Sequence, residues 1–253
     1  MRIVIIGTGN AASVLGRKFK AAGHSIVQVY GRNTSAASKL AYEWDTDSTN
    51  YISLITKEAD VYIIAVQDDA IAEVVKELQL PGKVVAHTAA SVPKEVLAAV
   101  TGHYGVFYPL QSLRKEVAEL PDIPIFTDGS DDTAIKQLEK LAKSIAGDNV
   151  SKAGNDDRRK MHVAAVVVNN FTNHLFALAE DYCKKEGLDF QQLIPLIEET
   201  ISRLRSASPS KTQTGPAIRH DRETIQQHLE LLNDHPQLKN VYLLLTESIQ
   251  QWK

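Results

Sequence analysis

A glycine-rich turn near the start of the chain has the spacing that cradles a phosphate group. Gly7, Gly9 and Ala12 form a Gly-x-Gly-x-x-Ala pattern that follows an apolar run and opens a helical pattern. The first glycine permits a tight turn, the second lets the backbone approach a pyrophosphate, and the small third residue lets the helix pack on the strand. The alternative is a glycine turn that binds nothing. We predict a dinucleotide cradle formed by Gly7, Thr8, Gly9, Asn10 and Ala11.

The residues after the second apolar run favour NADP(H) over NAD(H). NAD-binding domains place an acid about 20 residues after the glycines, where it binds the ribose 2′-hydroxyl. In this chain the first acid is Glu43, and Arg32 follows the second run instead. A guanidinium can grip a 2′-phosphate with two N–H groups, although a solvated arginine is the alternative. We predict that Arg32 binds the 2′-phosphate and that Asn33 and Thr34 add hydrogen bonds.

Two later strand ends are expected to face the same cofactor, because ligands bind outside the carboxyl ends of parallel strands. At the first end, Asp68 could instead simply cap the next helix. At the second, small residues leave space for a nicotinamide ring, although His87 could be an ordinary core histidine. The predicted cofactor contacts at these two ends are Val66, Gln67, His87, Thr88 and Ala89.

A polar stripe on a long helical pattern in the second half could supply a proton. At about 100° per residue, His162, Val166 and Asn169 fall within one stripe, with Asn170 at its border. An enzyme that acts on C=O or C=N with a nicotinamide needs a proton donor beside the hydride. We predict His162 as the acid or base and Asn169 and Asn170 as groups that orient the substrate. The alternative is that these side chains hydrogen-bond to neighbouring helices.

A loop rich in Ser, Thr, Pro and Gly, residues 206–221, carries a second candidate. Loops of this length are usually functional or disordered. Arg219 is predicted to bind a substrate carboxylate or a cofactor phosphate, or else to pair locally with Asp221. The histidines show no paired spacing typical of a metal site, so no metal is expected.

The elements that must position these residues fall into two groups. Up to residue 153, short runs rich in Val and Ile alternate with helical patterns, which is typical of parallel strands covered on both faces. Beyond it the patterns are helical, and the basic run at residues 158–160 is expected to be a solvated helix start. We predict the α/β class: a doubly wound Rossmann-type parallel sheet at residues 1–153, followed by an all-α domain at residues 154–253. The expected strands are Arg2–Ile6, Ser25–Tyr30, Val61–Val66, Lys83–His87, Gly105–Tyr108 and, more weakly, Ile123–Thr127. The expected helices are Ala11–Ala22, Ala36–Glu43, Ala70–Leu78, Pro93–Val100, Asp156–Glu186, Phe190–Leu204, Thr224–Asn233 and Gln237–Trp252.

Composition narrows the class of partner. The net charge is −3 and no basic block is present, so nucleic acid is not an expected partner. No stretch approaches the roughly 20 apolar residues of a membrane span. Cys183 is the single cysteine, which favours a reducing compartment and hence the cytoplasm. The expected partner is a small molecule.

Several motifs occur in a fixed order along the chain: residues Gly7–Asn10, His87–Ser91, Tyr108–Leu113, Met161–Ala165 with Asn169–Asn170, and Thr214–Asp221. Together they carry a resemblance to a known family. The chain resembles Rossmann-like NADP oxidoreductases with a helical C-terminal domain of uncharacterised function. These are similar to pyrroline-5-carboxylate reductases, deazaflavin-dependent NADP oxidoreductases and the 6-phosphogluconate and β-hydroxyacid dehydrogenases. The resemblance implies NADP(H) binding and a helical domain, like the C-terminal domain of 6-phosphogluconate dehydrogenase, through which the chain forms a homodimer. It supplies no substrate.

One departure from the dehydrogenases concerns the catalytic lysine. They carry it four residues before an asparagine on the first long helix of the second domain. Here Val166 stands four residues before Asn170, and Ala165 four before Asn169; neither transfers a proton. Two functions therefore remain open. The first is an NADP(H)-dependent oxidoreductase that reduces or oxidises a small C=O or C=N substrate in the cleft between the domains. The alternative is an NADP(H)-binding sensor or regulatory protein without turnover.

Overall fold

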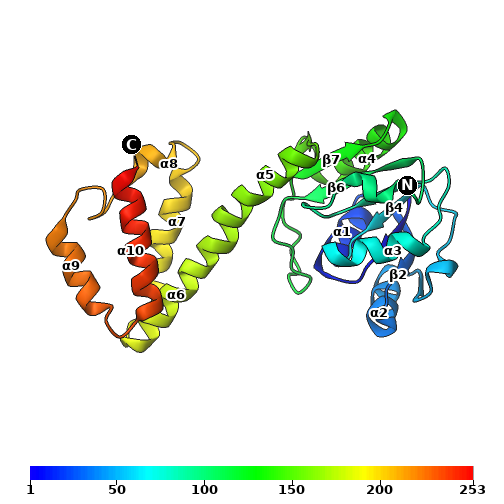
Figure 1. The fold of residues 1–253 in the computed structure, drawn as a ribbon. Helices are drawn as coiled ribbons and strands as arrows, with labels where there is room; N and C mark the ends of the chain where they lie inside the picture. Colours follow the sequence, from blue (N-terminus) through cyan, green and yellow to red (C-terminus); the bar gives the residue numbers. More distant parts are fainter. Residues whose placement is uncertain (253) are drawn as a thin grey trace. The chain divides into compact units, whose positions relative to one another are not determined.

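The computed structural model describes residues 1–252. The chain divides into two compact units, the first being Met1–Val166 and the second beginning at Val167 (Figure 1). The first unit therefore includes helix α5 (Asn155–Ala165), which the sequence analysis assigned to the helical domain. The domain boundary after residue 153 stays a prediction.

The first unit is built on an eight-stranded sheet in the order β3-β2-β1-β4-β5-β6-β7-β8. The strands from β1 to β6 pair in parallel, β7 runs antiparallel to β6, and β8 is parallel to β7. The strand order reverses between β1 and β4, and a crevice outside the carboxyl ends is expected there. The expected doubly wound α/β class is confirmed. The strands are β1 (Arg2–Ile6), β2 (Ser25–Tyr30), β3 (Asp47–Thr49), β4 (Val61–Ile64), β5 (Val84–His87), β6 (His103–Pro109), β7 (Ile125–Gly129) and β8 (Val150–Lys152).

Helical elements cover both faces of this sheet and complete two hydrophobic cores. On one face, α1 (Asn10–Ala21), α2 (Thr34–Trp44) and α4 (Asp132–Ala146) bury residues such as Phe19 and Leu138. On the other face, α3 (Ile71–Glu77) and the 3-10 turns η1 (Ile52–Leu54) and η3 (Lys94–Leu97) pack. The Val- and Ile-rich strands read as unbroken apolar runs because both faces are covered.

Helix α5 continues into α6 through a π-helical segment. The segment Val166–Phe171 follows α5 directly, and α6 spans Thr172–Lys185. The sequence pattern predicts one α-helix over this range. A π turn closes i→i+5 bonds, so it changes the angular position of every later side chain. The stripe expected at 100° per residue is therefore interrupted, and Asn169 and Asn170 lie inside the π segment.

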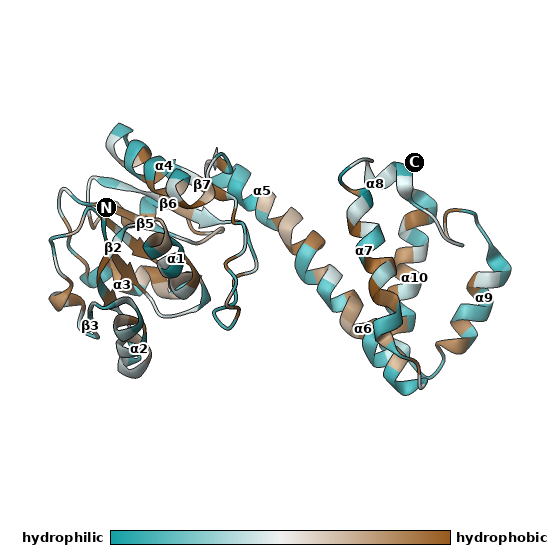
Figure 2. Ribbon diagram, turned by 180° about the vertical axis from the view of Figure 1, so that it is seen from behind, coloured by the Kyte–Doolittle hydropathy of each residue, from teal (hydrophilic) through white to brown (hydrophobic). Residues whose placement is uncertain are grey.

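The second unit is helical throughout its described part, as expected. Its buried apolar residues, among those described from Val167 onward, are Leu178, Cys183, Ala217 and Leu232. Figure 2 shows hydrophobic stretches along α7 and α10, whose residues Leu196 and Leu244 are about two-thirds exposed. No helix within residues 1–252 is long and apolar enough to cross a membrane. After α6 come η5 (Phe190–Leu193), α7 (Ile194–Arg203), the short α8 (Pro209–Thr212), α9 (Arg222–Leu231) and α10 (Pro236–Gln251).

Candidate functional site

The first glycine of the turn is required by its surroundings. Gly7 directly follows β1 and has φ +130°, a conformation that residues with a side chain rarely adopt. Its N–H donates to the Tyr30 carbonyl at 2.8 Å. A Cβ at Gly7 would collide with the backbone carbonyl of Ala65, which follows β4. The turn therefore draws the ends of β1, β2 and β4 close together.

The start of α1 has the geometry of an anion site. Gly9 is the N-cap and provides no capping side chain, and the first helical bond runs from the Ser13 N–H to the Gly9 carbonyl at 3.0 Å. A Cβ at Gly9 would meet nothing within 4 Å, so the turn is open on that side. The first-turn N–H groups and the positive end of the helix dipole thus face open space, which fits a pyrophosphate.

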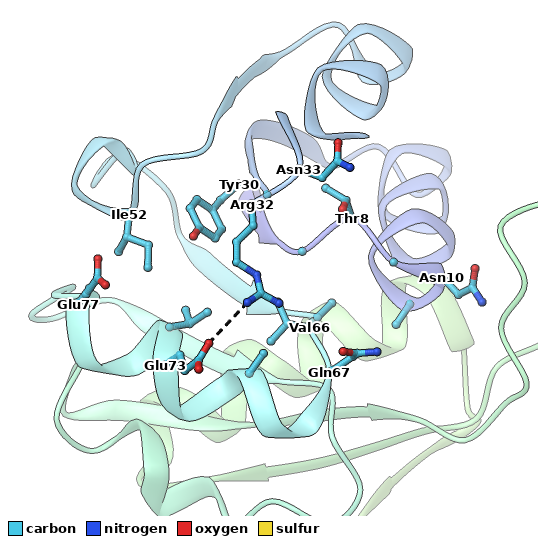
Figure 3. A pocket seen from close by; sticks show the side chains of 17 residues that line it. Thr8, Asn10, Tyr30, Arg32, Asn33, Ile52, Val66, Gln67, Glu73 and Glu77 are labelled. Atoms are coloured by element: carbon cyan, nitrogen blue, oxygen red, sulfur yellow. Dashed lines mark ion pairs between the residues drawn. The ribbon is translucent and has the colours of Figure 1, made fainter. Parts of the chain in front are cut away.

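A cavity of about 520 Å³ opens in front of this turn (Figure 3). Its volume lies in the range of small-molecule sites. Residues that follow the carboxyl ends of β1, β2 and β4 line it together with residues of α3 from Glu73 to Glu77. Of the predicted cofactor contacts, the cavity wall includes Gly7, Thr8, Gly9, Asn10, Ala11, Arg32, Asn33, Val66 and Gln67.

The Arg32 side chain reaches across the cavity toward α3, as Figure 3 shows. Its Nη1 lies 3.6 Å from a carboxylate oxygen of Glu73, and both side chains are mostly exposed. Asn33 is committed elsewhere, because its Oδ1 accepts the Ala36 N–H at 2.9 Å and caps α2. Thr34 begins that helix. The cap leaves the positive end of α2 beside Arg32, which suits a 2′-phosphate.

Two acids in the cavity were missed by the sequence analysis. Glu73 and Glu77 belong to α3 and line the same wall as Arg32. The spacing of NAD-binding domains places the ribose-binding acid about 20 residues after the glycines, and α3 lies well beyond that point. The signal available was positional: a helix that follows a strand in a doubly wound sheet starts near the ligand crevice.

The Asn10 side chain helps to fix a segment beyond β6. Its Oδ1 accepts the Lys115 N–H at 3.3 Å. About two turns further along α1, the Arg17 guanidinium donates to the carbonyls of Lys115 and Val117, both at 3.0 Å. These bonds hold the 115–117 segment beside the start of α1, although it is distant in sequence.

His87 fits the alternative interpretation, a core histidine. It is fully buried at the end of β5, and its Nδ1 accepts the Ala89 N–H at 3.2 Å. Burial, together with the nearby Arg158 cation, lowers the pKa of His87 to about 4. It is therefore neutral near pH 7. His87, Thr88 and Ala89 are buried and do not belong to the described cavity wall, so their contact with the nicotinamide stays a prediction.

Arg158 is buried, contrary to the expectation of a solvated helix start. Only 1 % of it is exposed. Its guanidinium donates to the carbonyls of Ala90 at 2.9 Å and Val92 at 2.6 Å, and to Oδ1 of Asn155 at 3.0 Å. The expectation was wrong because the backbone after β5 presents carbonyl groups that the sequence pattern does not reveal. Arg158 thereby fastens α5 to the loop after β5.

His162, the predicted acid or base, lies at the carboxyl end of β6. Its Nδ1 is 3.1 Å from the hydroxyl of Tyr108, and the two rings meet edge to face with centroids 6.2 Å apart. Tyr108 is buried in β6, and burial raises its pKa. The structure thus brings His162 to the same edge of the sheet as the glycine turn.

The remaining candidates belong to the second unit. Asn169 and Asn170 are exposed in the π segment. Arg219 is also exposed, 3.9 Å from a carboxylate oxygen of Asp221, so the local pairing foreseen as the alternative is present. Asp221 also caps α9 by accepting the Thr224 N–H at 3.1 Å. The catalytic roles of these three residues stay predictions.

Among the residues that the structure describes, no group of three or more His, Cys, Asp or Glu side chains is placed to hold a metal ion.

Comparisons with known proteins agree with this geometry. Residues 2–91 match the family NADP oxidoreductase coenzyme F420-dependent, and residues 123–249 match the Domain of unknown function (DUF2520). No curated protein matches the chain.

Among solved structures, a Bacteroides fragilis protein assigned to the NADP oxidoreductases is 36% identical, with a TM-score of 0.90 over 99% of this chain and 98% of that one. An imine reductase of Myxococcus stipitatus, solved with NADP+, is 15% identical with a TM-score of 0.68, over 99% and 93% of the two chains. The 1-pyrroline-5-carboxylate reductase of Streptococcus pyogenes is 17% identical with a TM-score of 0.64, over 100% and 99%. At these identities the last two show the fold alone.

The cofactor and enzyme class follow from the family, and the glycine turn, the open start of α1 and Arg32 fit the group. The chain belongs to the family that joins an NADP oxidoreductase domain to a DUF2520 domain, and it is an oxidoreductase that uses NADP(H).

Proposed function

We propose that the chain transfers a hydride between NADP(H) and a small molecule that carries a C=O or C=N bond, with His162 as the proton donor or acceptor. The observation that carries this proposal is the position of His162. It is held against the carboxyl end of β6, at the edge of the sheet where the glycine turn and Arg32 form the cofactor cavity. Ligands in this type of sheet bind at that edge.

Each group has a distinct task in the proposed reaction. Bound NADPH supplies the hydride to the carbon of the double bond. The turn at Gly7 and Gly9 with the start of α1 binds the pyrophosphate, and Arg32 binds the 2′-phosphate. His162 gives a proton to the oxygen or nitrogen as the double bond is reduced, and it recovers a proton from solvent. In the reverse direction His162 accepts the proton.

The relatives support the substrate class. The names of the Myxococcus stipitatus and Streptococcus pyogenes proteins describe reduction of an imine and of a pyrroline, both with C=N bonds. Asn169, Asn170 and Arg219 are proposed to orient the substrate. The position of the substrate between the two domains remains a prediction.

The test is oxidation of NADPH by the purified protein with a panel of cyclic imines, ketone–amine mixtures, keto acids and an oxidised deazaflavin. For an accepted compound, His162→Gln is expected to lower kcat by at least about 100-fold, because general acid catalysis contributes about 10²–10⁴. The Kd for NADPH should change less than about twofold. His174→Gln, at an exposed histidine of α6, is the matched control and should keep full activity.

Two outcomes would contradict parts of the proposal. Retained turnover in His162→Gln would remove its role as acid or base. Tight NADPH binding by a wild-type protein that turns over no member of the panel would support the sensor or regulatory alternative instead.

We also propose that the second unit mediates homodimerisation. Its described helices bury few apolar side chains of their own and leave Leu196, Ile201, Leu231 and Leu244 more than half exposed. Exposed apolar surface of this extent marks an interaction site. A second copy of this chain could bury these apolar side chains in a symmetric dimer, so no other partner is needed.

A further inference from the structure

Tyr108 and His162 form a pair that the proposed reaction does not yet explain. Tyr108 is 8% exposed, and its ring stacks on Phe126 with centroids 6.4 Å apart. Its hydroxyl lies 3.1 Å from Nδ1 of His162. A buried tyrosine hydroxyl normally finds a hydrogen-bond partner, and here the partner is the proposed acid or base.

This contact decides which ring nitrogen of His162 exchanges protons. The hydroxyl can accept from Nδ1–H, which is present in the protonated ring and also in the neutral ring that has released its proton from Nε2. Nδ1 is engaged in both states, so Nε2 is the nitrogen left for another molecule. The partner of one ring nitrogen commonly sets the role of the other.

The position of His162 is fixed by a second contact on the same helix. Arg158 lies four residues earlier in α5, on the same face of the helix. Its bonds to the carbonyls of Ala90 and Val92 hold that face against the loop after β5. Arg158 therefore sets where α5 lies, and the Tyr108 hydroxyl sets how the imidazole is turned.

We propose that Tyr108 is a positioning residue: its hydroxyl holds Nδ1 of His162 so that Nε2 exchanges the proton with the substrate. This inference rests on the proposed function. The hydroxyl itself is a poor acid at this site, because burial raises the pKa of Tyr108, with Asp68 adding to the effect and Arg158 opposing it. Because its hydroxyl faces Nδ1 of His162, Tyr108 acts through that ring rather than as the proton donor.

A double-mutant cycle on kcat tests this dependence. Tyr108→Phe removes only the hydroxyl and keeps the ring that packs on Phe126. It is expected to lower kcat about 10- to 100-fold with KM and the Kd for NADPH within about twofold, since small errors in position are costly for a reacting group. In the His162→Gln background, Tyr108→Phe is expected to cause no further loss, because the two residues act as one group.

The matched control is Tyr104→Phe, at the other end of β6, which should leave kcat unchanged. An unchanged kcat in Tyr108→Phe would overturn the proposal. So would a loss of the same size in the wild-type and His162→Gln backgrounds, which would show that Tyr108 acts independently of His162.

A second readout is independent of turnover. In ¹⁵N spectra of the cofactor-free protein, with the His162 ring identified by its absence in His162→Gln, Tyr108→Phe is expected to move the Nδ1 resonance more than the Nε2 resonance. An unmoved Nδ1 resonance would overturn the proposal even if no substrate were found. Failure of the proposed function shows differently: His162→Gln would keep full activity while the Nδ1 resonance still responded to Tyr108→Phe.

Discussion

Arg32 and Glu73 meet across the cofactor cavity from two elements far apart in sequence. Arg32 follows β2 and Glu73 lies in α3, and their charged atoms are 3.6 Å apart. An exposed pair of this kind contributes little stability, about 0–1 kcal/mol. The pair matters more for the choice of ligand, because in the proposed role of Arg32 a 2′-phosphate displaces Glu73 from the guanidinium. In that proposal, bound NADPH replaces one anionic partner of Arg32 by another.

This exchange makes opposite predictions for the two residues. Arg32→Glu is expected to weaken NADPH binding by at least about tenfold, since it removes the fork that binds the phosphate and adds repulsion. NADH binding should change little. Glu73→Gln is expected to tighten NADPH binding by up to about fivefold, the scale of one exposed ion pair. Titration of cofactor fluorescence measures the affinity of each variant for NADPH and for NADH.

Glu43→Gln is the control, because Glu43 is an exposed acid of α2 outside the cavity wall. It should leave both affinities unchanged. Equal weakening of NADPH and NADH by Arg32→Glu would contradict the assignment of Arg32 to the 2′-phosphate.

At the scale of elements, Arg158 is the link between α5 and the sheet. Arg158→Met keeps an unbranched apolar stem but leaves the carbonyls of Ala90 and Val92 without their donor. We expect the free energy of unfolding to fall by about 2–4 kcal/mol, since hydrogen bonds to a charged group contribute about 1.5–3 kcal/mol each and removal of a buried cation offsets part of the loss. Urea denaturation measures the change.

The neighbouring arginine provides the control for that experiment. Arg159 is exposed and bonds only within α5, to Asp156 and the Asn155 carbonyl. Arg159→Met should change the free energy of unfolding by less than about 0.5 kcal/mol. Equal stability of the two variants would show that Arg158 does not anchor the helix.

The central strands were predictable and several other elements were not. β1 and β4 are covered on both faces, so they read as apolar runs, and their bounds agree closely with the prediction. β3 and β8 have three residues each, too few to show a pattern. Helix α4 was missed although Leu138, Leu141 and Ala142 form its buried face. The residues of Pro93–Val100 form only the 3-10 turn η3, because a short apolar run does not fix the helix type.

The site was predictable where its residues are neighbours in sequence. The glycine turn follows β1 and Arg32 lies two residues after the end of β2. Their positions at the sheet edge could therefore be predicted from the order of residues along the chain. Glu73 and the Tyr108–His162 contact join distant segments, and no local pattern predicts such pairs. The π segment could not be foreseen from a periodicity that assumes 100° per residue throughout.

At the scale of the whole molecule, the apolar surface of the second unit leads to a prediction about assembly. Leu244 in α10 is 67% exposed. Leu244→Asp places a charge on the proposed dimer surface, where burial without a partner is costly. We expect the wild type to sediment as a dimer and this variant to dissociate at least about tenfold more readily.

The first unit offers a matched control for this charge. Leu54 in η1 has 62% exposure, close to that of Leu244. Leu54→Asp should leave the sedimentation of the protein unchanged. A wild type that sediments as a monomer at all concentrations would contradict the proposed dimer. Equal effects of Leu54→Asp and Leu244→Asp would show that the dimer does not depend specifically on the surface of the second unit.

The two ends of the eight-stranded sheet have a consequence for aggregation. β3 and β8 are the outermost strands, and each has only three residues. Lys152 of β8 is held in an ion pair with Glu139 at 2.9 Å. Short, charged edge strands offer little backbone for another chain to pair with, and this is how natural sheets resist growth into fibrils. At high protein concentration, the sheet edges thus resist strand pairing with another copy, whereas the exposed helices of the second unit can still associate.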